Sequence, residues 1–245
     1  MSLMLAFLML RLEAPLMSFG CEAIDANGPT RDFPDASLLT GLLANALGYS
    51  RYETAKHQRL QDRLVFGVRI DRLGRDLRDF QTAQLSRTDQ SWTTRGKPEG
   101  RTGGERTYDS PHIRLRHYRA DAALTLAARL VPPDEPPTLD DLAIALDHPA
   151  RSLFIGRKPC LPSAPLLIGI REGNTCVAAL QAMHPADGAL DRCRFMIPRR
   201  EADALSASSI MHLTGRRDWI AGIHAGEETV AILTLPTQAT DGADR

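Results

Sequence analysis

The sequence has no Ala, Val, Ile, Leu or Met anywhere between residues 86 and 112. A stretch without aliphatic side chains cannot bury enough apolar surface to offset the entropy that it loses on ordering. It lies between two strand-like apolar runs, at Leu64–Ile70 and Ala120–Leu130. We therefore expect the segment at about 75–119 to protrude from the body of the protein as a long, mobile arm.

Net charge is also absent from the chain as a whole, which has 30 Lys and Arg against 30 Asp and Glu. The segment from Arg63 to Arg119 nevertheless has 13 basic and 7 acidic residues. Only three of the basic residues in the chain are Lys, and Arg favours bidentate phosphate contacts and stacking on bases. The concentrated positive charge therefore indicates nucleic acid as the ligand of the arm.

Several motifs that would indicate an enzyme are missing. The four cysteines include no C-x-x-C pair and no close His pair, which argues against a zinc site and favours free thiols in a reducing cytosol. There is no Walker loop, G-x-S-x-G or H-E-x-x-H motif, and the acidic pairs lack the spacing of a two-metal nuclease. We expect no metal and no cofactor.

The apolar run at residues 3–10 has the composition of a signal peptide but lacks a basic region in front of it. Arg11 and Glu13 follow too soon for a membrane span. We therefore expect a strand here, and a cytoplasmic protein without a membrane partner.

The order of apolar patterns predicts an α+β fold. A strand over 3–12 is expected to stop at Pro15, and a helix begins with Asp35 or Ser37 as its N-cap and ends at Gly48. Further strands are predicted over 64–71, 120–130 and 166–170, with a second helix over 138–146. This β-α-β-β-α-β order is typical of an RRM-like (ferredoxin-like) domain, here residues 1–170, with the arm between its second and third strands.

Beyond residue 171 the patterns weaken. Short strands are predicted over 175–182, 192–197, 218–221 and 229–235. They indicate a small β-rich C-terminal subdomain over 171–236, followed by a loose tail over 237–245.

Three stretches match a known family in order and spacing. They are FPDASLLTGLLANALG at 33–48, HYRADA at 117–122 and LFIGRKPC at 153–160, with weaker matches at 10–20 and 77–82. In these stretches the chain resembles the Cas-five (CasD) family, which supplies a subunit of the type I-E CRISPR surveillance complex Cascade. The matches cover residues 10–160 and leave the C-terminal third without support.

The resemblance implies an RRM-like domain with a long thumb and a small β-rich C-terminal part. Such subunits hold the 5′ handle of the CRISPR RNA at one end of the complex in antiviral defence. They cap the filament of backbone subunits and contact the large subunit that reads the PAM. Another subunit cuts the RNA in type I-E, so the resemblance implies a non-catalytic scaffold. Target DNA would be engaged only indirectly, because RNA base pairing reads its sequence.

One departure from the family concerns the start of the first helix. The family usually has Thr and then Lys or Arg after the proline, whereas this chain has Asp35 and Ala36 after Pro34. A carboxylate here would repel phosphate, although the helix N-terminus itself favours anions. We carry over no phosphate contact at position 36, and Arg31 is the residue that could compensate.

The candidate RNA-binding residues are basic or aromatic residues of the arm and residues inside the matching stretches. Arg119 is the strongest of them because it lies inside a motif, and Arg119→Ala is predicted to weaken handle binding. A charged surface turn, a solubilising strand face or aromatic packing against a partner subunit would explain the same residues without RNA. The candidates are Arg31, Ser37, Arg78, Trp92, Arg95, Arg101, Arg106, Tyr108, Arg114, Arg116, Tyr118, Arg119, Arg157 and Lys158.

Two other functions stay open. A type I-C branch of the family cuts CRISPR RNA without metal by using His, Lys and Tyr, and Arg116-His117-Tyr118 has a superficially suitable composition for such a metal-independent endoribonuclease. Arginine stays protonated, however, and cannot serve as the base. The third possibility is a stand-alone RRM-type RNA binder, which would stay soluble without partners.

Overall fold

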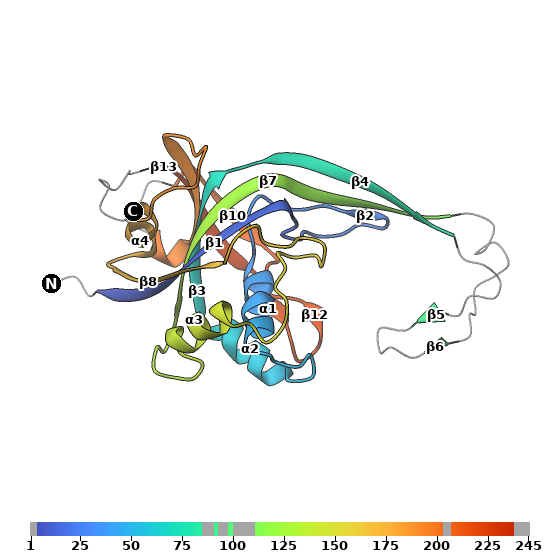
Figure 1. Ribbon diagram of the computed structural model, residues 1–245, viewed down its shortest axis with the longest axis horizontal. Coiled ribbons are helices and arrows are strands. Elements are labelled where there is room, and N and C mark those ends of the chain that lie inside the picture. The colour runs from blue at the N-terminus through green and yellow to red at the C-terminus, as the bar shows by residue number, and fades with distance from the viewer. Residues whose placement is uncertain (1–3, 85–90, 93–97, 100–110, 203–206, 238–245) are drawn as a thin grey trace.

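A single large sheet organises the protein. The computed structural model describes residues 4–84, 91–92, 98–99, 111–202 and 207–237. The strands follow the order β10-β13-β9-β3-β7-β1-β8, and all these neighbours are antiparallel (Figure 1). Their bounds are β1 Leu5–Met17, β3 Leu64–Arg72, β7 His112–Leu130, β8 Leu167–Gly173, β9 Arg192–Pro198, β10 Ser209–Leu213 and β13 Glu228–Pro236.

The remaining elements are the helices, several short strands and the longer strand β4, which pairs with the first half of β7. The helices are α1 Ala36–Ala46, α2 Thr54–Arg63, α3 Leu139–Asp147 and α4 Cys176–Gln181, with a 3-10 turn at Arg199–Glu201. The other strands are β2 Asn27–Gly28, β4 Arg75–Ala83, β5 Ser91–Trp92, β6 Pro98–Glu99, β11 Arg217–Asp218 and β12 Ile223–His224. The prediction of an α+β protein with an antiparallel sheet is confirmed.

Strand β1 is longer than predicted, because it continues past Pro15 to Met17. It pairs with β8 only as far as Leu10, so one of its sides has no strand neighbour where Pro15 lies. A proline lacks the N–H that a ladder needs and is tolerated at such an edge.

Both helices predicted with caps are confirmed. Asp35 is the N-cap of α1, where its side chain accepts a hydrogen bond from the Leu38 amide at 2.8 Å. Thr138 and Asp141 form a capping box at the start of α3. Helix α2 was not predicted, because its sequence TAKHQRLQDR has only one large aliphatic residue and no apolar stripe.

The C-terminal third corrects two predictions and confirms two. Residues 175–182 are not a strand, because Thr175 caps helix α4 with its hydroxyl on the Ala178 amide at 3.1 Å. The strand predicted over 218–221 shrinks to β11, and the Asp218 carboxylate caps the turn that follows. Strands β9 and β13 are confirmed, and through the β3–β9 pairing they continue the main sheet.

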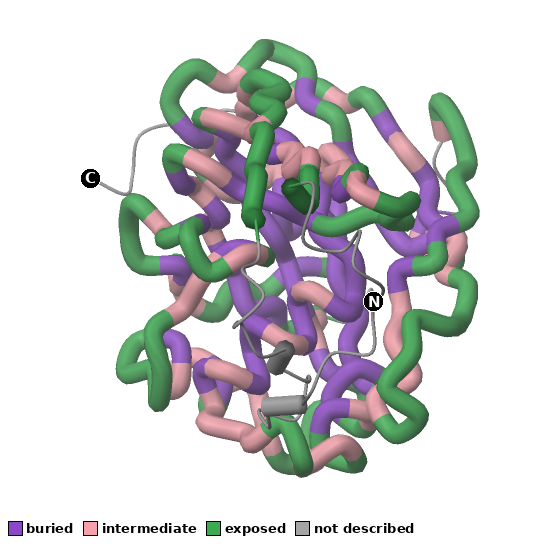
Figure 2. The backbone as a smooth tube through the Cα atoms, turned by 90° about the vertical axis from the view of Figure 1, so that its right-hand side faces the viewer, coloured by how far each residue is buried: buried purple, intermediate pink, exposed green. Residues whose placement is uncertain are grey.

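Apolar side chains fill both faces of the sheet, and Figure 2 shows the buried residues gathered inside an exposed shell. On one face α1 and α3 cover a cluster that includes Leu10, Leu39 and Leu126. On the other, α4 covers a cluster that includes Phe7 and Phe195. None of the helices in the described ranges has the length and apolar character needed to cross a membrane.

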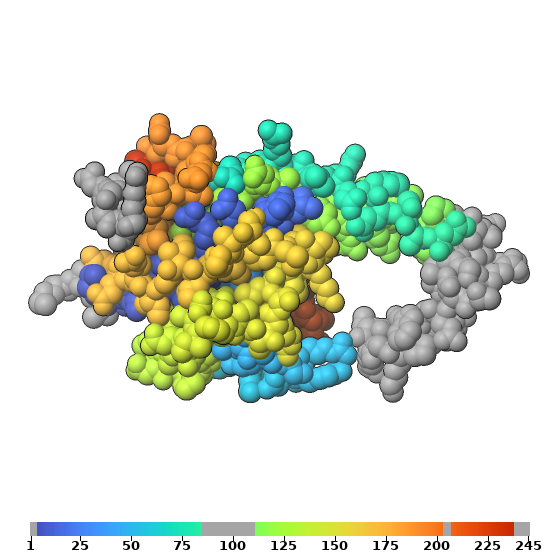
Figure 3. Space-filling view, in the orientation of Figure 1, coloured from blue at the N-terminus to red at the C-terminus, as the bar shows by residue number. Residues whose placement is uncertain are grey.

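A two-stranded arm leaves this body. It consists of β4 and the first half of β7, paired from Arg75 opposite Ala120 to Ala83 opposite His112. Figures 1 and 3 show it extending well beyond the helices. Most of its side chains are exposed, including Phe80 at 61%.

Candidate nucleic-acid interface

A basic corner forms at the base of the arm, where β2 lies beside β7. Gly28 pairs with Arg116, and a Cβ built on Gly28 would lie 3.3 Å from Arg116 Nη1 and 3.2 Å from Arg157 Nη2. Two guanidinium groups therefore flank one glycine. Arg157 donates to the carbonyls of His117 at 3.0 Å and Gly28 at 3.1 Å, and lies 4.8 Å above the Tyr118 ring.

The turn at residues 155–160 places Lys158 beside this corner. Gly156 has φ +91°, and a Cβ there would come 1.6 Å from the Ser18 carbonyl oxygen, so only glycine fits. The Ile155 amide donates to the Cys160 carbonyl and the Cys160 amide to the Arg157 carbonyl, both at 2.8 Å, and these two bonds close the turn. Lys158 is exposed, next in sequence to the pinned Arg157. We call Arg116, Arg157 and Lys158 the basic corner, and its three cations suit a phosphate backbone.

Arg119 is held differently, in a chain of ion pairs. Its guanidinium contacts Asp32 and also Asp76, the latter at 3.0 Å, and only 13% of its side chain is exposed. Asp32 in turn accepts from Arg194 at 2.5 Å. Because two carboxylates share the charge of Arg119, its geometry favours positioning of the arm over direct phosphate binding.

The start of α1 carries its own negative charge. Asp35 caps the helix, and Arg31 contacts Asp35 at 3.3 Å and Glu22 at 2.6 Å. Burial raises the pKa of the Asp35 carboxyl above its ordinary value. Ser37 is buried, and its amide donates to the Gly215 carbonyl at 3.0 Å. Both sequence candidates here, Arg31 and Ser37, are thus engaged within the chain.

Further candidates lie along the arm. Arg78 and Arg114 are exposed on β4 and β7, and Arg114 donates to the Ile113 carbonyl at 2.8 Å. Trp92 belongs to β5, but its side chain is outside the described part of the chain. Four other candidates fall outside the described residues altogether, namely Arg95, Arg101, Arg106 and Tyr108.

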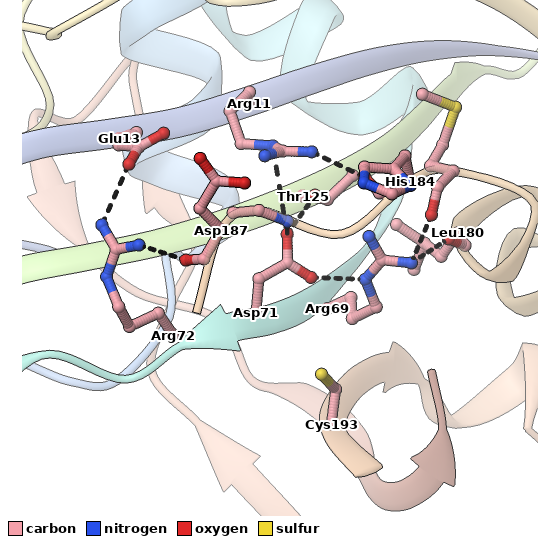
Figure 4. Close-up of polar contacts among 12 residues, drawn as sticks. Arg11, Glu13, Arg69, Asp71, Arg72, Thr125, Leu180, His184, Asp187 and Cys193 are labelled. Carbon is pink, nitrogen blue, oxygen red and sulfur yellow. Dashed lines mark hydrogen bonds and ion pairs between the residues drawn. The ribbon is translucent and has the colours of Figure 1, made fainter. Parts of the chain in front are cut away.

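Part of the positive charge counted in the sequence serves the fold. Arg69 and Asp71 are fully buried and paired at 2.5 Å, and Arg69 also donates to the carbonyls of Leu180 and Met183 (Figure 4). Arg72 reaches Glu13 at 2.9 Å and the Asp187 carbonyl at 2.5 Å. These residues pin the loop after α4 to the sheet, so the excess of positive charge over 63–119 overstates what a ligand could meet.

Sequence reasoning missed three residues of this region. Gly28 and Asn27 are not among the sequence candidates, yet Gly28 leaves room for two guanidinium groups and Asn27 Oδ1 lies 3.0 Å from His117 Nε2. Arg194 lies in the strand predicted over 192–197 and is not among the candidates either. The Gly28-Pro29 pair was the available signal, since glycine permits close approach of the backbone to other groups. In the described ranges, no group of three or more His, Cys, Asp or Glu could hold a metal ion.

The chain is similar to known CRISPR proteins over nearly its whole length. The family model Cas_Cas5d, "CRISPR-associated protein (Cas_Cas5)", matches residues 7–231. The chain is 31% identical over 193 residues to "CRISPR system Cascade subunit CasD" of Escherichia coli (strain K12), covering 76% of this chain and 80% of CasD.

Two solved structures share the fold. A chain of a "CRISPR RNA-guided surveillance complex" has a TM-score of 0.65 at 22% identity, with 97% of this chain and 95% of that one covered. "Crystal structure of Cas protein" has a TM-score of 0.58 at 23% identity, with 94% and 95% covered. The family predicted from the sequence motifs is therefore confirmed, and the chain belongs to the CRISPR-associated Cas5 family.

Proposed function

We propose that this protein is a non-catalytic CRISPR-RNA-binding subunit of a type I-E Cascade complex. In this proposal it holds the 5′ handle of the CRISPR RNA and caps the filament of backbone subunits in the cytoplasm. It also contacts the large PAM-reading subunit and engages target DNA only through the RNA. The observation that carries the proposal is the basic corner, where the Gly28 backbone leaves space for two guanidinium groups, that of Arg116 and the hydrogen-bonded one of Arg157, next to an exposed lysine.

The architecture supports the same proposal. The strand order β8-β1-β7-β3, with helices after β1 and β7, corresponds to the order expected of an RRM-like core, and we take the β4–β7 arm to be the thumb. Single-stranded RNA is recognised by cations that follow its backbone and by surfaces on which its bases stack. The basic corner at the base of the long arm offers cations that could follow the RNA backbone.

The test is a tagged pull-down of the full chain co-expressed with its neighbouring genes, followed by sequencing of the RNA that co-purifies. We expect one multi-subunit particle with one CRISPR RNA, whose 5′ handle resists nuclease only when this chain is present. Recovery of the chain alone with mixed cellular RNA would favour the stand-alone binder and contradict the proposal.

A variant pair connects the result to the basic corner. Lys158→Ala should lower RNA retention, whereas Lys56→Ala removes an exposed lysine that pairs with Glu53 on α2 and should change nothing. Each lost phosphate contact is expected to make binding less dependent on salt by roughly one unit of slope. Equal retention by both variants would remove the corner from the interface.

The endoribonuclease alternative is tested by incubating the protein with repeat RNA in EDTA. Tyr118 is 5% exposed beneath Arg157, and His117 is bonded to Asn27, so neither side chain stands free beside Lys158. We expect no cleavage. Specific cuts that disappear in His117→Ala would establish the enzyme instead.

A further inference from the structure

We propose that a pocket beside the base of the arm receives one extruded nucleobase of the bound RNA. The inference rests on the proposed RNA-binding function and adds a site to it. The pocket has a volume of about 310 Å³, which is at the lower end of the range of roughly 300–1,000 Å³ for small-molecule sites.

The register of three neighbouring strands builds its floor. Ile70 on β3 lies opposite Arg194 on β9, and Met196, two residues further along β9, lies opposite Ile232 on β13. Residues two apart in a strand share a face, so these side chains point to the side of the sheet that α1 covers. Ile70 and Met196 belong to the core on that side, and Ile232 packs against it. The floor is therefore apolar and rigid.

The walls come from two other segments. Phe33 lies on the loop before α1 and is 5% exposed, while Met211 on β10 is 39% exposed. Together they give an aromatic ring and a polarisable thioether across an apolar floor. A flat heteroaromatic ring gains from both kinds of surface.

The polar end of the pocket carries arginines. Arg194 is 43% exposed, and Asp32 holds its guanidinium at 2.5 Å. The same Asp32 binds Arg119 of the arm, so the pocket mouth is connected to the arm through one carboxylate. Gly28 at the basic corner and Asp32 at the pocket are four residues apart, so at most about 14 Å of chain separates them. The basic corner and the pocket are thus close enough for one RNA strand to reach both.

This combination favours a nucleotide over an apolar side chain of a protein partner. The Asp32 carboxylate that pairs with Arg194 is shared with Arg119, so a purely apolar partner would cover the exposed part of the Arg194 guanidinium without offering it a further acceptor. A nucleotide offers a ring for the floor and a phosphate for the guanidinium. Stacked bases contribute about 1–3 kcal/mol each in single-strand binders, which amounts to roughly fivefold to 150-fold in affinity, and tenfold lies near the lower end of that range.

The experiment combines a variant of the pocket with CRISPR RNAs that each lack one base. The complex is reconstituted on synthetic CRISPR RNAs that each lack one base of the handle, and the affinity of the full chain for each RNA is measured. With the wild-type chain, we expect one abasic position to cost about tenfold. With Met211→Trp, which fills the pocket, that position should cost less than about twofold, because the base no longer has a site.

Ile210→Trp is the matched control. Ile210 is the neighbour of Met211 on β10, lies on the opposite face of the strand and is 49% exposed. This variant should keep the tenfold penalty. Arg194→Gln offers a second variant that leaves the apolar floor intact, and it should weaken binding to intact and abasic RNA alike.

Three outcomes overturn the proposal. The first is that no abasic position lowers the affinity, and the second is that the penalty persists unchanged in Met211→Trp. Loss of a protein subunit from the Met211→Trp particle with RNA affinity unchanged would identify the pocket as a protein contact, which also contradicts it. A wild-type chain that binds none of the RNAs would instead refute the proposed function itself.

Discussion

Replacing Arg69 with Met should lower the free energy of unfolding by about 3 kcal/mol, because the substitution removes the close ionic partner of the buried Asp71 and leaves it the more distant Arg11, at 3.9 Å. Neither side chain has any exposed surface, and the two are paired at 2.5 Å. The carbonyls of Leu180 and Met183 also lose their donor. Removal of one member of a buried pair typically costs roughly 3–5 kcal/mol. The lower end applies because Asp71 keeps donors from Thr125 at 2.6 Å and from the Ala186 amide at 3.2 Å.

Thermal unfolding of the purified chain measures this loss. For a chain of this size, about 3 kcal/mol corresponds to a fall in melting temperature of roughly 6–12 °C. Arg78→Met is the control, since Arg78 is exposed on the arm and should change stability by less than about 0.5 kcal/mol. Arg69→Met combined with Asp71→Asn should lose less than the sum of the single variants, because the second change removes the stranded charge. If Arg69→Met alone were as stable as wild type, the reasoning would be refuted.

Three further predictions test the fold and the interface. Thr138→Ala removes the α3 capping box and should lower the free energy of unfolding, measured by thermal unfolding, by about 1 kcal/mol. Thr138→Ser should largely preserve stability. Burial raises the pKa of the Glu228 carboxyl, so the folded state holds its proton to higher pH, and stability should fall as pH rises above 4.5. Glu228→Gln should therefore have a higher melting temperature than wild type at pH 7, and its melting temperature should change less with pH. A lower melting temperature at pH 7 would contradict this prediction. Gly156→Ala drives a Cβ to within 1.6 Å of the Ser18 carbonyl, so RNA retention should fall at least as far as in Lys158→Ala. Unchanged retention would exclude the turn from RNA binding.

The parts of the fold that sequence predicted are those with local causes. Helices α1 and α3 each carry a capping side chain within three residues of the amide that it satisfies. Strands β3, β9 and β13 are short apolar runs whose burial shows in their composition. Such signals need no knowledge of distant segments.

The errors lie where tertiary contacts decide the structure. Helix α2 has almost no aliphatic residues and is held partly by Gln61, which donates to the Arg217 carbonyl at 2.8 Å across 156 residues. Helix α4 has apolar residues in a pattern that also suits a short strand, and only the Thr175 cap distinguishes the two. Periodicity over so few residues cannot separate helix from strand.

The candidate site shows the same limit at the level of single side chains. Which arginines of the arm can meet a ligand depends on where their acidic partners lie. Arg69 has Asp71 two residues away in a strand of apolar neighbours, a local hint of a buried pair. Arg119 instead meets Asp32 from 87 residues away, and that aspartate also takes Arg194 from 162 residues away. A count of charges along the chain cannot see these pairs. The cations that remain for RNA are therefore those whose surroundings supply carbonyls or solvent, as at Arg157 and Lys158, together with those that stay well exposed beside a shared carboxylate, as Arg194 does at 43%.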